Sequence, residues 1–136
     1  MPYINIRLGA TLDSAQRDQL YQKTTFFMNT IMGKRREVTV VHIQEDDPQQ
    51  WATNAITLNI EDPTGAYVDI KVTEGTNTSE EKAEMLSQTV KMLQDVVGTI
   101  QEACYVVIDD IPANSWGYNG KTQAVRAASK PGKVIT

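Results

Sequence analysis

The sequence has few of the residues that build metal centres and disulfides. Its 136 residues include one cysteine, Cys104, and one histidine, His42. A single cysteine excludes a disulfide within the chain, and one cysteine with one histidine cannot form the clusters that hold structural zinc. We therefore expect Cys104 to be a small buried residue of a strand, with a reactive thiol as the alternative. We expect His42 to be an ordinary residue on a strand face, with a catalytic histidine as the alternative.

Long apolar runs and an excess of positive charge are also missing. The apolar runs are a few residues long, whereas a membrane-spanning helix needs roughly 20, and the N-terminus lacks a basic segment followed by an apolar core. The net charge of −4 gives no basic field that would attract nucleic acid. With 40% hydrophobic and 22% charged residues, the sequence predicts one cytoplasmic domain that binds neither membranes nor nucleic acid.

The chain contains the same order of elements twice. Residues 3–8 alternate apolar and polar side chains as a strand does, a helical segment follows, and 38–43 is rich in β-branched residues. The second copy begins with the strand 67–72, continues through a helix and closes with the strand 104–108. The helix of the second copy carries apolar side chains at helical spacing at Leu86, Val90, Leu93, Val97 and Ile100.

Helix caps and spacing support this internal repeat. Asp13 precedes the first helix, and Thr78 with Glu81 forms a capping-box pattern before the second. Each copy ends in an acidic stretch with a proline that leads to a tryptophan, and Trp51 and Trp116 are 65 residues apart. Two β-α-β units with a nearly constant offset indicate a duplicated architecture.

The repeat predicts an α+β fold in which tandem β-α-β modules form one four-stranded mixed sheet with two helices on one face. The strands of each module should be parallel because a helix joins them. The modules span about 2–60 and 66–120 and form a single domain, joined by a turn-rich connection. Asn119 and Gly120 predict a hairpin, and a polar tail from Ala128 either pairs with a neighbouring subunit or is loose. The uncovered sheet face favours oligomerisation.

The chain has a proline directly after the initiator methionine, at the start of such a module. A β-α-β unit that begins in this way resembles the tautomerase superfamily. Residues 104–119 are similar both to the end of the 4-oxalocrotonate tautomerase unit and to the C-terminal region of macrophage migration inhibitory factor, and Met32–Arg36 is similar to a Gly-Lys region of the latter. The resemblance implies a fused two-module form, a homotrimer, and an isomerase that interconverts keto and enol forms of 2-oxo acids. It implies no metal or organic cofactor.

The same resemblance implies that Pro2 is the catalytic base, once Met1 has been removed. An N-terminal proline is a secondary amine, and α-amino groups ordinarily titrate near 7.7–8.0. Burial and nearby cations lower that pKa, so that a neutral amine is available at pH 7 as a general base. If Met1 is retained, Pro2 is an amide without basicity and a non-catalytic family member is the alternative.

Five further residues are candidates for substrate binding. Cations and aromatic walls suit an anionic, enolate-like transition state, and the resemblance places such groups at Lys34, Arg35, Arg36, Tyr105 and Trp116. The alternatives are a solvated basic loop for the three cations and core packing for the two aromatic side chains. Trp51 corresponds to Trp116 in the first copy and lines a similar pocket or has only a structural role.

The family pattern is incomplete in two places. The stretch 9–13 lacks the arginine with which 4-oxalocrotonate tautomerases bind their substrate, and 76–78 lacks the arginines of the related dehalogenases and malonate semialdehyde decarboxylases. Glu37 lies near the acidic position with which those enzymes activate water. A hydratase, dehalogenase or decarboxylase of the same superfamily is therefore the second hypothesis.

Overall fold

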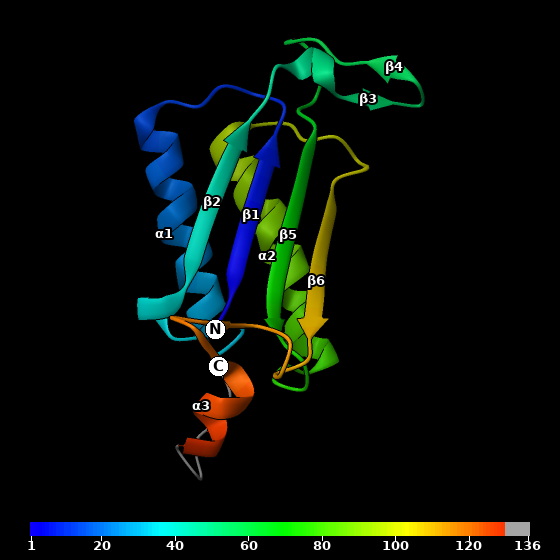
Figure 1. Cartoon of the computed structure of the whole chain (residues 1–136). Coiled ribbons are helices and arrows are strands. Elements are labelled where there is room, and N and C mark those ends of the chain that lie inside the picture. The colour runs from blue at the N-terminus through cyan, green and yellow to red at the C-terminus, as the bar shows by residue number, and fades with distance from the viewer. Residues whose placement is uncertain (130–136) are drawn as a thin grey trace.

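A four-stranded mixed sheet with two long helices on one of its faces dominates the computed structural model, which describes residues 1–129 (Figure 1). The strand order is β2-β1-β5-β6; β1 is parallel to β2, β5 is parallel to β6, and β1 and β5 are antiparallel. This topology confirms the predicted fold class. The elements are β1 (Tyr3–Leu8), α1 (Ser14–Thr30), β2 (Val40–Glu45), β5 (Ala66–Thr73), α2 (Ser79–Val97) and β6 (Tyr105–Ile111).

Both helices begin at the predicted caps. The Asp13 side chain accepts a hydrogen bond from the backbone of Gln16, and the Gln16 side chain accepts one from the backbone of Asp13. Thr78 and Glu81 form the same reciprocal pair at α2. These side chains satisfy backbone N–H groups that have no partner inside the helix.

The core lies between the sheet and the helices. Alternate residues of the two central strands point toward the helices and are fully buried, as the period of two predicts: they are Ile4, Ile6, Leu8, Val68, Ile70 and Val72. Leu20 and Met28 of α1 and Met85 and Leu93 of α2 pack against them. Each such side chain stabilises the fold by about 1.5–3 kcal/mol relative to an exposed one.

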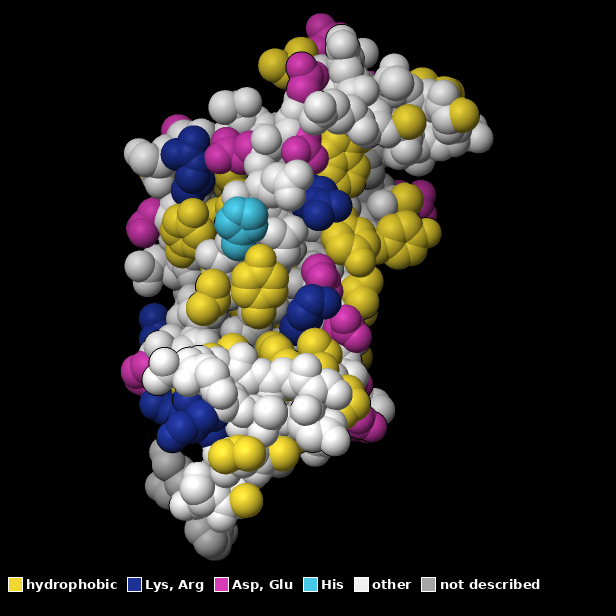
Figure 2. Space-filling view, viewed as in Figure 1, with side chains coloured by type: hydrophobic (Ala, Val, Ile, Leu, Met, Phe, Trp, Pro, Cys, Tyr) yellow, Lys and Arg dark blue, Asp and Glu magenta, His cyan; other side chains and the backbone are white. Residues whose placement is uncertain are grey.

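The opposite face of the sheet is left uncovered by residues 1–129 along most of its length; at the end where β5 stops, Trp116 lies against Thr73, which is fully buried (Figure 2). This face is more polar than a core face. Asn5 lies 2.6 Å from the ring of His42 across β1 and β2, and the Lys71 ammonium forms ion pairs with Asp69 and Asp109 across β5 and β6. Apolar side chains lie between these groups, among them Val40, Tyr105 and Val107. The uncovered face agrees with the sequence analysis, and its mixed chemistry is a finding of the structure.

Short elements close each half of the chain. A 3-10 turn, η1 (Arg36–Val38), delays the start of β2 to Val40, and η2 (Pro48–Gln50) precedes a small hairpin of β3 (Ala52–Thr53) and β4 (Ile56–Thr57). In the second half, β7 (Gly117–Tyr118) and β8 (Lys121–Thr122) form the predicted hairpin. Its turn residues Asn119 and Gly120 have positive φ.

The short helix α3 (Gln123–Ser129) follows this hairpin and includes Ala128, where the sequence analysis placed the start of a polar tail. The rest of that predicted tail lies outside the described residues. Between residues 1 and 129, no helix combines the length and the apolar character that crossing a membrane requires.

Candidate active site

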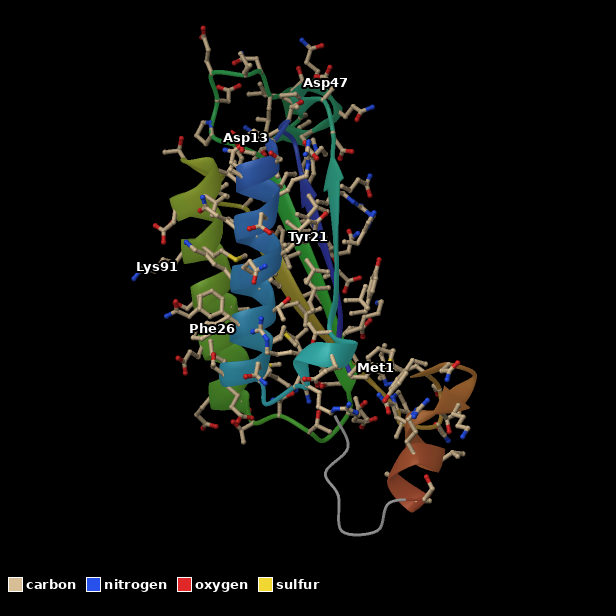
Figure 3. All side chains as sticks on the ribbon, turned by 90° about the vertical axis from the view of Figure 1, so that its left-hand side faces the viewer. Met1, Asp13, Tyr21, Phe26, Asp47 and Lys91 are labelled. Carbon is tan, nitrogen blue, oxygen red and sulfur yellow. The ribbon has the colours of Figure 1, made fainter. Side chains whose placement is uncertain are left out.

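Pro2 lies buried at the end of the sheet where β1 begins and β5 and β6 end. Its carbonyl oxygen accepts a hydrogen bond from the backbone of Val40 at the start of β2 (3.3 Å). On the other side, Tyr3 pairs with Lys71 in the antiparallel register, so residues 1–2 lie alongside the last residues of β5. Figure 3 shows Met1 at this end, between η1 and the C-terminal segment. The first residues of the chain are thus held on both sides by sheet strands.

Lys34 is brought to the same end by the termination of α1. Its backbone N–H donates to Met28, its carbonyl accepts from the Asn29 side chain, and the preceding Gly33 has a φ of +69°. The side chain is buried, with 1% of the residue exposed. Its ammonium donates to the Thr76 hydroxyl at 2.7 Å. Lys34 is therefore a fixed internal cation rather than part of a solvated loop.

Burial changes the protonation of Lys34. Loss of hydration lowers its pKa from 10.5 to about 8, although the nearby carboxylates of Glu81 and Asp110 act in the opposite direction. The ammonium form still predominates at pH 7. A positive charge is consequently held at the sheet end at a cost in folding free energy.

The environment at this end of the sheet lowers the pKa of the amine at the start of the chain. The pKa of the Met1 α-amino group falls from 8.0 to about 5, first because the group is buried and then because Lys34 and Arg35 repel its positive form. The same three causes would act on a proline nitrogen one residue further along. This end of the sheet therefore favours a neutral chain-terminal amine at pH 7.

The structure separates the three predicted basic residues. Lys34 is buried, whereas the Arg35 guanidinium is half-exposed and forms a 3.6 Å ion pair with Glu37. Arg36 turns to the outer surface of α1, where it borders a shallow hollow with Lys23 and Phe26. Only the first two act electrostatically on the terminal amine.

Trp116 joins Pro2 and Lys34 at this end through β5. The indole N–H donates to the Thr73 hydroxyl at 3.1 Å, and the residue is half-buried. Thr73 is the last residue of β5, and its carbonyl accepts from the hydroxyl of Thr76, the partner of Lys34. Trp116 and Lys34 are thus linked through the segment from Thr73 to Thr76, and the pairing of Tyr3 with Lys71 places Pro2 at the same end of the sheet.

Tyr105 lies elsewhere in the chain. It begins β6, where it pairs with Tyr67, and Tyr67 pairs with Arg7 near the end of β1. Its side chain is exposed on the uncovered face. Within one chain, Tyr105 is therefore near the opposite end of the sheet from Pro2.

Trp51 is also at that opposite end. Its indole packs against the backbone of Gly9 and Gly65 and donates to the Asp46 carboxylate at 3.2 Å. Close packing on two glycines indicates the structural role that the sequence analysis considered for this residue.

Sequence reasoning did not single out Thr73 and Thr76. Their hydroxyls receive the hydrogen bonds of Trp116 and Lys34, respectively. The only local signal is their position between the end of a strand and the cap of α2, where polar residues are common. Among residues 1–129, no group of three or more His, Cys, Asp or Glu side chains is arranged to hold a metal ion.

The comparison with known proteins agrees with this arrangement. Residues 67–126, less than half of the chain, match the family model described as tautomerase enzyme. The probable tautomerase K2 of Dickeya dadantii (strain 3937) is 27% identical over 60 residues, which are 44% of this chain and 90% of that protein. These matches support a tautomerase-type, isomerase function.

Solved structures share the fold over nearly the whole chain. A wild-type fused 4-OT in the form of an asymmetric trimer has a TM-score of 0.78 and 17% identity, covering 94% of this chain and 99% of its own. The homologue of macrophage migration inhibitory factor from Prochlorococcus marinus has a TM-score of 0.73 and 22% identity, covering 88% and 97%. Residues 67–126 thus resemble the tautomerase family in sequence, and nearly the whole chain shares the fold of these solved structures.

Proposed function

We propose that the protein is a cofactor-independent keto-enol tautomerase in which the secondary amine of Pro2, freed by removal of Met1, is the general base. The observation that carries the proposal is the buried end of the sheet, where a terminal amine is desolvated and lies near the cation Lys34. A base of lowered pKa beside a fixed positive charge suits proton transfer within an anionic substrate.

The proposed reaction moves one proton without a change in oxidation state. In a 2-hydroxy enoate, the proline nitrogen accepts the proton of the enol hydroxyl, and the oxygen becomes the 2-oxo group. The electron pair moves to the carbon chain, which takes the proton back from the proline ammonium. Negative charge is greatest between the two transfers, when cations stabilise it most.

In this proposal, two cations and one indole form the substrate-binding site. Lys34 binds the developing negative charge at oxygen, Arg35 attracts the carboxylate from its half-exposed position, and Trp116 forms an apolar wall that excludes water. The Lys34–Thr76 hydrogen bond supports this assignment, because it limits where the ammonium lies before the substrate arrives. Arg36 lies outside the proposed pocket of its own chain.

We further propose that the active form is a homotrimer in which the uncovered sheet faces are buried. The fused 4-OT relative is described as a trimer, and the uncovered face carries exposed Val40, Tyr105 and Val107. Tyr105 then reaches a Pro2 pocket from a neighbouring copy, since it is far from Pro2 in its own chain. A single domain of two modules and a cytoplasmic location stay predictions from the sequence.

The second hypothesis from the sequence gains no support at Glu37. Its side chain is 71% exposed and paired with Arg35. A carboxylate that activates water for hydration or dehalogenation works best where burial raises its pKa. The proposal therefore remains with tautomerisation.

The test is the ketonisation of phenylenolpyruvate and 2-hydroxymuconate, followed by ultraviolet absorbance. Intact mass first establishes that Met1 is absent. Pro2→Ala should lower kcat/KM about 100-fold or more, the usual contribution of a general base, with an unchanged circular dichroism spectrum. If the variant retains full turnover, or if protein that begins with Pro2 acts on neither substrate, the proposal is wrong.

A further inference from the structure

The hydroxyl of Thr76 makes two hydrogen bonds at the end of the sheet where Pro2 lies. It donates to the carbonyl oxygen of Thr73 at 2.6 Å, and it accepts from the Lys34 ammonium at 2.7 Å. A hydroxyl has one hydrogen, and the Asn77 side-chain oxygen, at 3.4 Å, is a more distant acceptor for it. The hydrogen therefore points to Thr73, and the oxygen presents its lone pairs to Lys34.

The backbone around Lys34 is held from the same short segment. The Asn77 amide donates to the carbonyl of Met32 at 2.9 Å and to the Glu81 carboxylate at 3.2 Å. Both of its N–H donors are thereby used, and the amide joins the loop before Lys34 to the capping box of α2. Thr76 and Asn77 thus hold the ammonium and the neighbouring backbone from two adjacent positions.

Charged groups face Lys34 from several elements. The carboxylates of Glu81 on α2 and Asp110 on β6 favour its ammonium form, whereas burial opposes that form and lowers the pKa to about 8. Arg35 and the terminal amine, when protonated, add positive charge nearby. Thr76 supplies the acceptor in direct contact with the ammonium, and a hydrogen bond from a charged donor favours the charged form.

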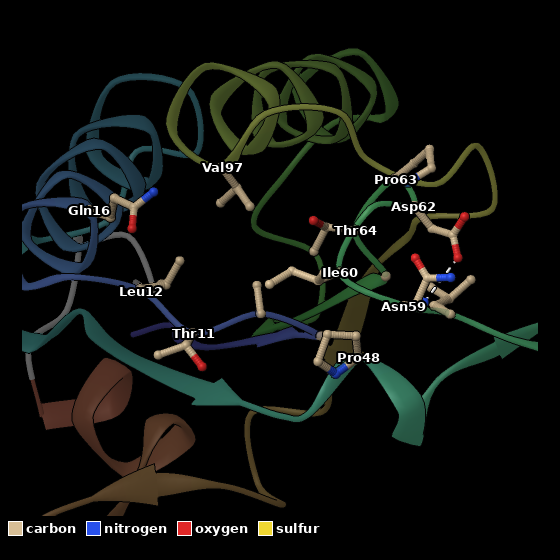
Figure 4. Close-up of a pocket in the computed structure, with 14 residues that line it drawn as sticks. Thr11, Leu12, Gln16, Pro48, Asn59, Ile60, Asp62, Pro63, Thr64 and Val97 are labelled. Atoms are coloured by element: carbon tan, nitrogen blue, oxygen red, sulfur yellow. Dashed lines mark hydrogen bonds between the residues drawn. The ribbon is translucent and has the colours of Figure 1, made fainter.

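The first half of the chain has the corresponding threonine without the cation. Thr76 lies two residues before the cap of α2, and Thr11 lies two residues before the cap of α1. Thr11 lines a pocket at the opposite end of the sheet, and the lining residues, all within the described part of the chain, include no lysine or arginine (Figure 4). The threonine therefore belongs to the repeated frame, whereas its contact with a buried cation is particular to the Pro2 end.

From these contacts we propose that Thr76 is a positioning residue for the proposed reaction, whose hydroxyl holds the Lys34 ammonium in place and keeps it charged. Thr76 itself contacts no reacting atom. The inference rests on the proposed function, because the charge of Lys34 affects turnover only if negative charge develops on the substrate. Turnover then requires a neutral terminal amine together with a charged Lys34, and it should fall as Lys34 loses its proton.

The first test observes Lys34 without a substrate. Protein in its native oligomeric state, with isotope-labelled lysine side chains, is titrated with alkali and followed by NMR, and Lys34→Met identifies the signal. The midpoint should lie near pH 8 in the unmodified chain. Thr76→Val replaces the hydroxyl by a methyl group and should lower this midpoint by about one pH unit or more, as expected for a hydrogen bond to a charged group.

The second test measures kcat/KM for phenylenolpyruvate between pH 5 and pH 10. The basic limb of the profile should follow the Lys34 midpoint. Thr76→Val should move this limb to lower pH by the same amount as the NMR midpoint, so that kcat/KM falls about fivefold or more at pH 8 and less at pH 6. Thr76→Ser keeps the hydroxyl and should restore both the midpoint and the profile.

Thr11→Val is the matched control, because it makes the same change at the corresponding place of the first half. It should alter neither the Lys34 midpoint nor the pH profile. Thr76→Ala removes the same hydroxyl with less bulk and should reproduce the effect of Thr76→Val. Circular dichroism spectra establish that each variant is folded.

Two results would overturn the inference while the unmodified enzyme is active. One is a Lys34 midpoint that is the same in the folded Thr76→Val and Thr76→Ala proteins as in the unmodified chain, and the other is a loss in Thr76→Ser as large as that in Thr76→Val. Failure of the proposed function looks different: the unmodified protein then shows no turnover although the midpoint still shifts in Thr76→Val. That result would overturn the catalytic part of the inference together with the proposed reaction.

Discussion

The two ends of the sheet have the same arrangement of elements but different side chains. At one end, β1 begins directly after Pro2, Trp116 donates a hydrogen bond to Thr73, and Lys34 donates one to Thr76. At the other end, β5 begins after Gly65, and Trp51 packs on Gly9 and Gly65. In the internal repeat, Lys34 of the first half corresponds to Thr99 of the second half, and Gly9 of the first half corresponds to Thr73 of the second. A cation and a hydroxyl at the first end are thus replaced by a neutral residue and a glycine at the second.

This comparison shows which differences create a candidate active site on a duplicated fold. Both halves have a capped helix that is followed by a glycine of positive φ, at Gly33 and Gly98. Both halves also have a tryptophan before a short hairpin. The frame is repeated, whereas the chain terminus and the buried charge occur at one end. In the proposed reaction, the catalytic chemistry therefore depends on few residues, and the other end is free to pack tightly.

Removing the charge of Lys34 should have the largest effect on activity and stability among the changes that distinguish the two ends of the sheet. Lys34→Met should lower kcat/KM by about 100-fold, since it removes a donor aimed at the developing negative charge. The same change should raise the free energy of unfolding at pH 7 by roughly 1–3 kcal/mol, because a buried cation of lowered pKa is replaced by an apolar side chain. Kinetics and urea denaturation measure the two quantities.

The pH dependence of stability distinguishes the effect of the Lys34 charge from the effect of its packing. The folded-state pKa of Lys34, about 8, is below its ordinary value of 10.5, so the unfolded chain binds more protons between these values. Stability conferred through this residue should rise with pH across that window, and Lys34→Met should lack this rise. Thr99→Met, at the matching position, is the control and should keep full activity. Equal loss of activity in both variants would contradict the asymmetry.

The second prediction concerns packing at the amine-free end. A Cβ atom at Gly65 would lie 2.8 Å from Cε3 of Trp51, so Gly65→Ala should lower the free energy of unfolding by about 1–3 kcal/mol. Tautomerase activity should not change at a temperature well below the transition. Adding Trp51→Phe should recover part of the loss, and strictly additive effects in the double variant would show that the two residues do not interact.

The two tryptophans give a third, smaller contrast. Trp116→Phe removes the indole N–H that donates to Thr73 and should lower kcat/KM about fivefold, in line with about 1 kcal/mol for a hydrogen bond. Trp51→Phe removes the bond to Asp46 and should affect stability but not turnover. Matching kinetics in the two variants would place Trp116 outside the active site.

The smallest predicted effect is at Arg35. Arg35→Gln should raise the pKa of the terminal amine, because a cation that disfavours the protonated form is lost. The acidic limb of the kcat/KM profile should then move to higher pH by roughly 0.2–0.5 pH unit, as expected for a half-exposed charge. Arg36→Gln should leave the profile unchanged, and a shift of equal size there would indicate a general effect of net charge.

Local patterns in the sequence were sufficient for most of the fold. Alternation at 3–8 and 67–72 predicted the two central strands, and the structure extends the second by one residue at each end, to Ala66 and Thr73. Asp13 and Thr78 marked the helix starts because a cap is formed by residues three positions apart. The helix α3 was not anticipated; it contains seven residues, too few for a clear period.

The sequence by itself determined the repeat, the caps and the alternation, because each depends on neighbours along the chain. Only the tertiary structure decided which of Lys34, Arg35 and Arg36 is buried, since Lys34 donates a hydrogen bond to Thr76, which is 42 residues away along the chain. It also decided the place of Tyr105: β5 is antiparallel to β1, and β6 is parallel to β5, so the start of β6 lies away from the start of β1. Such distances through space depend on how strands pair, and strand pairing is set by the packing of the whole sheet.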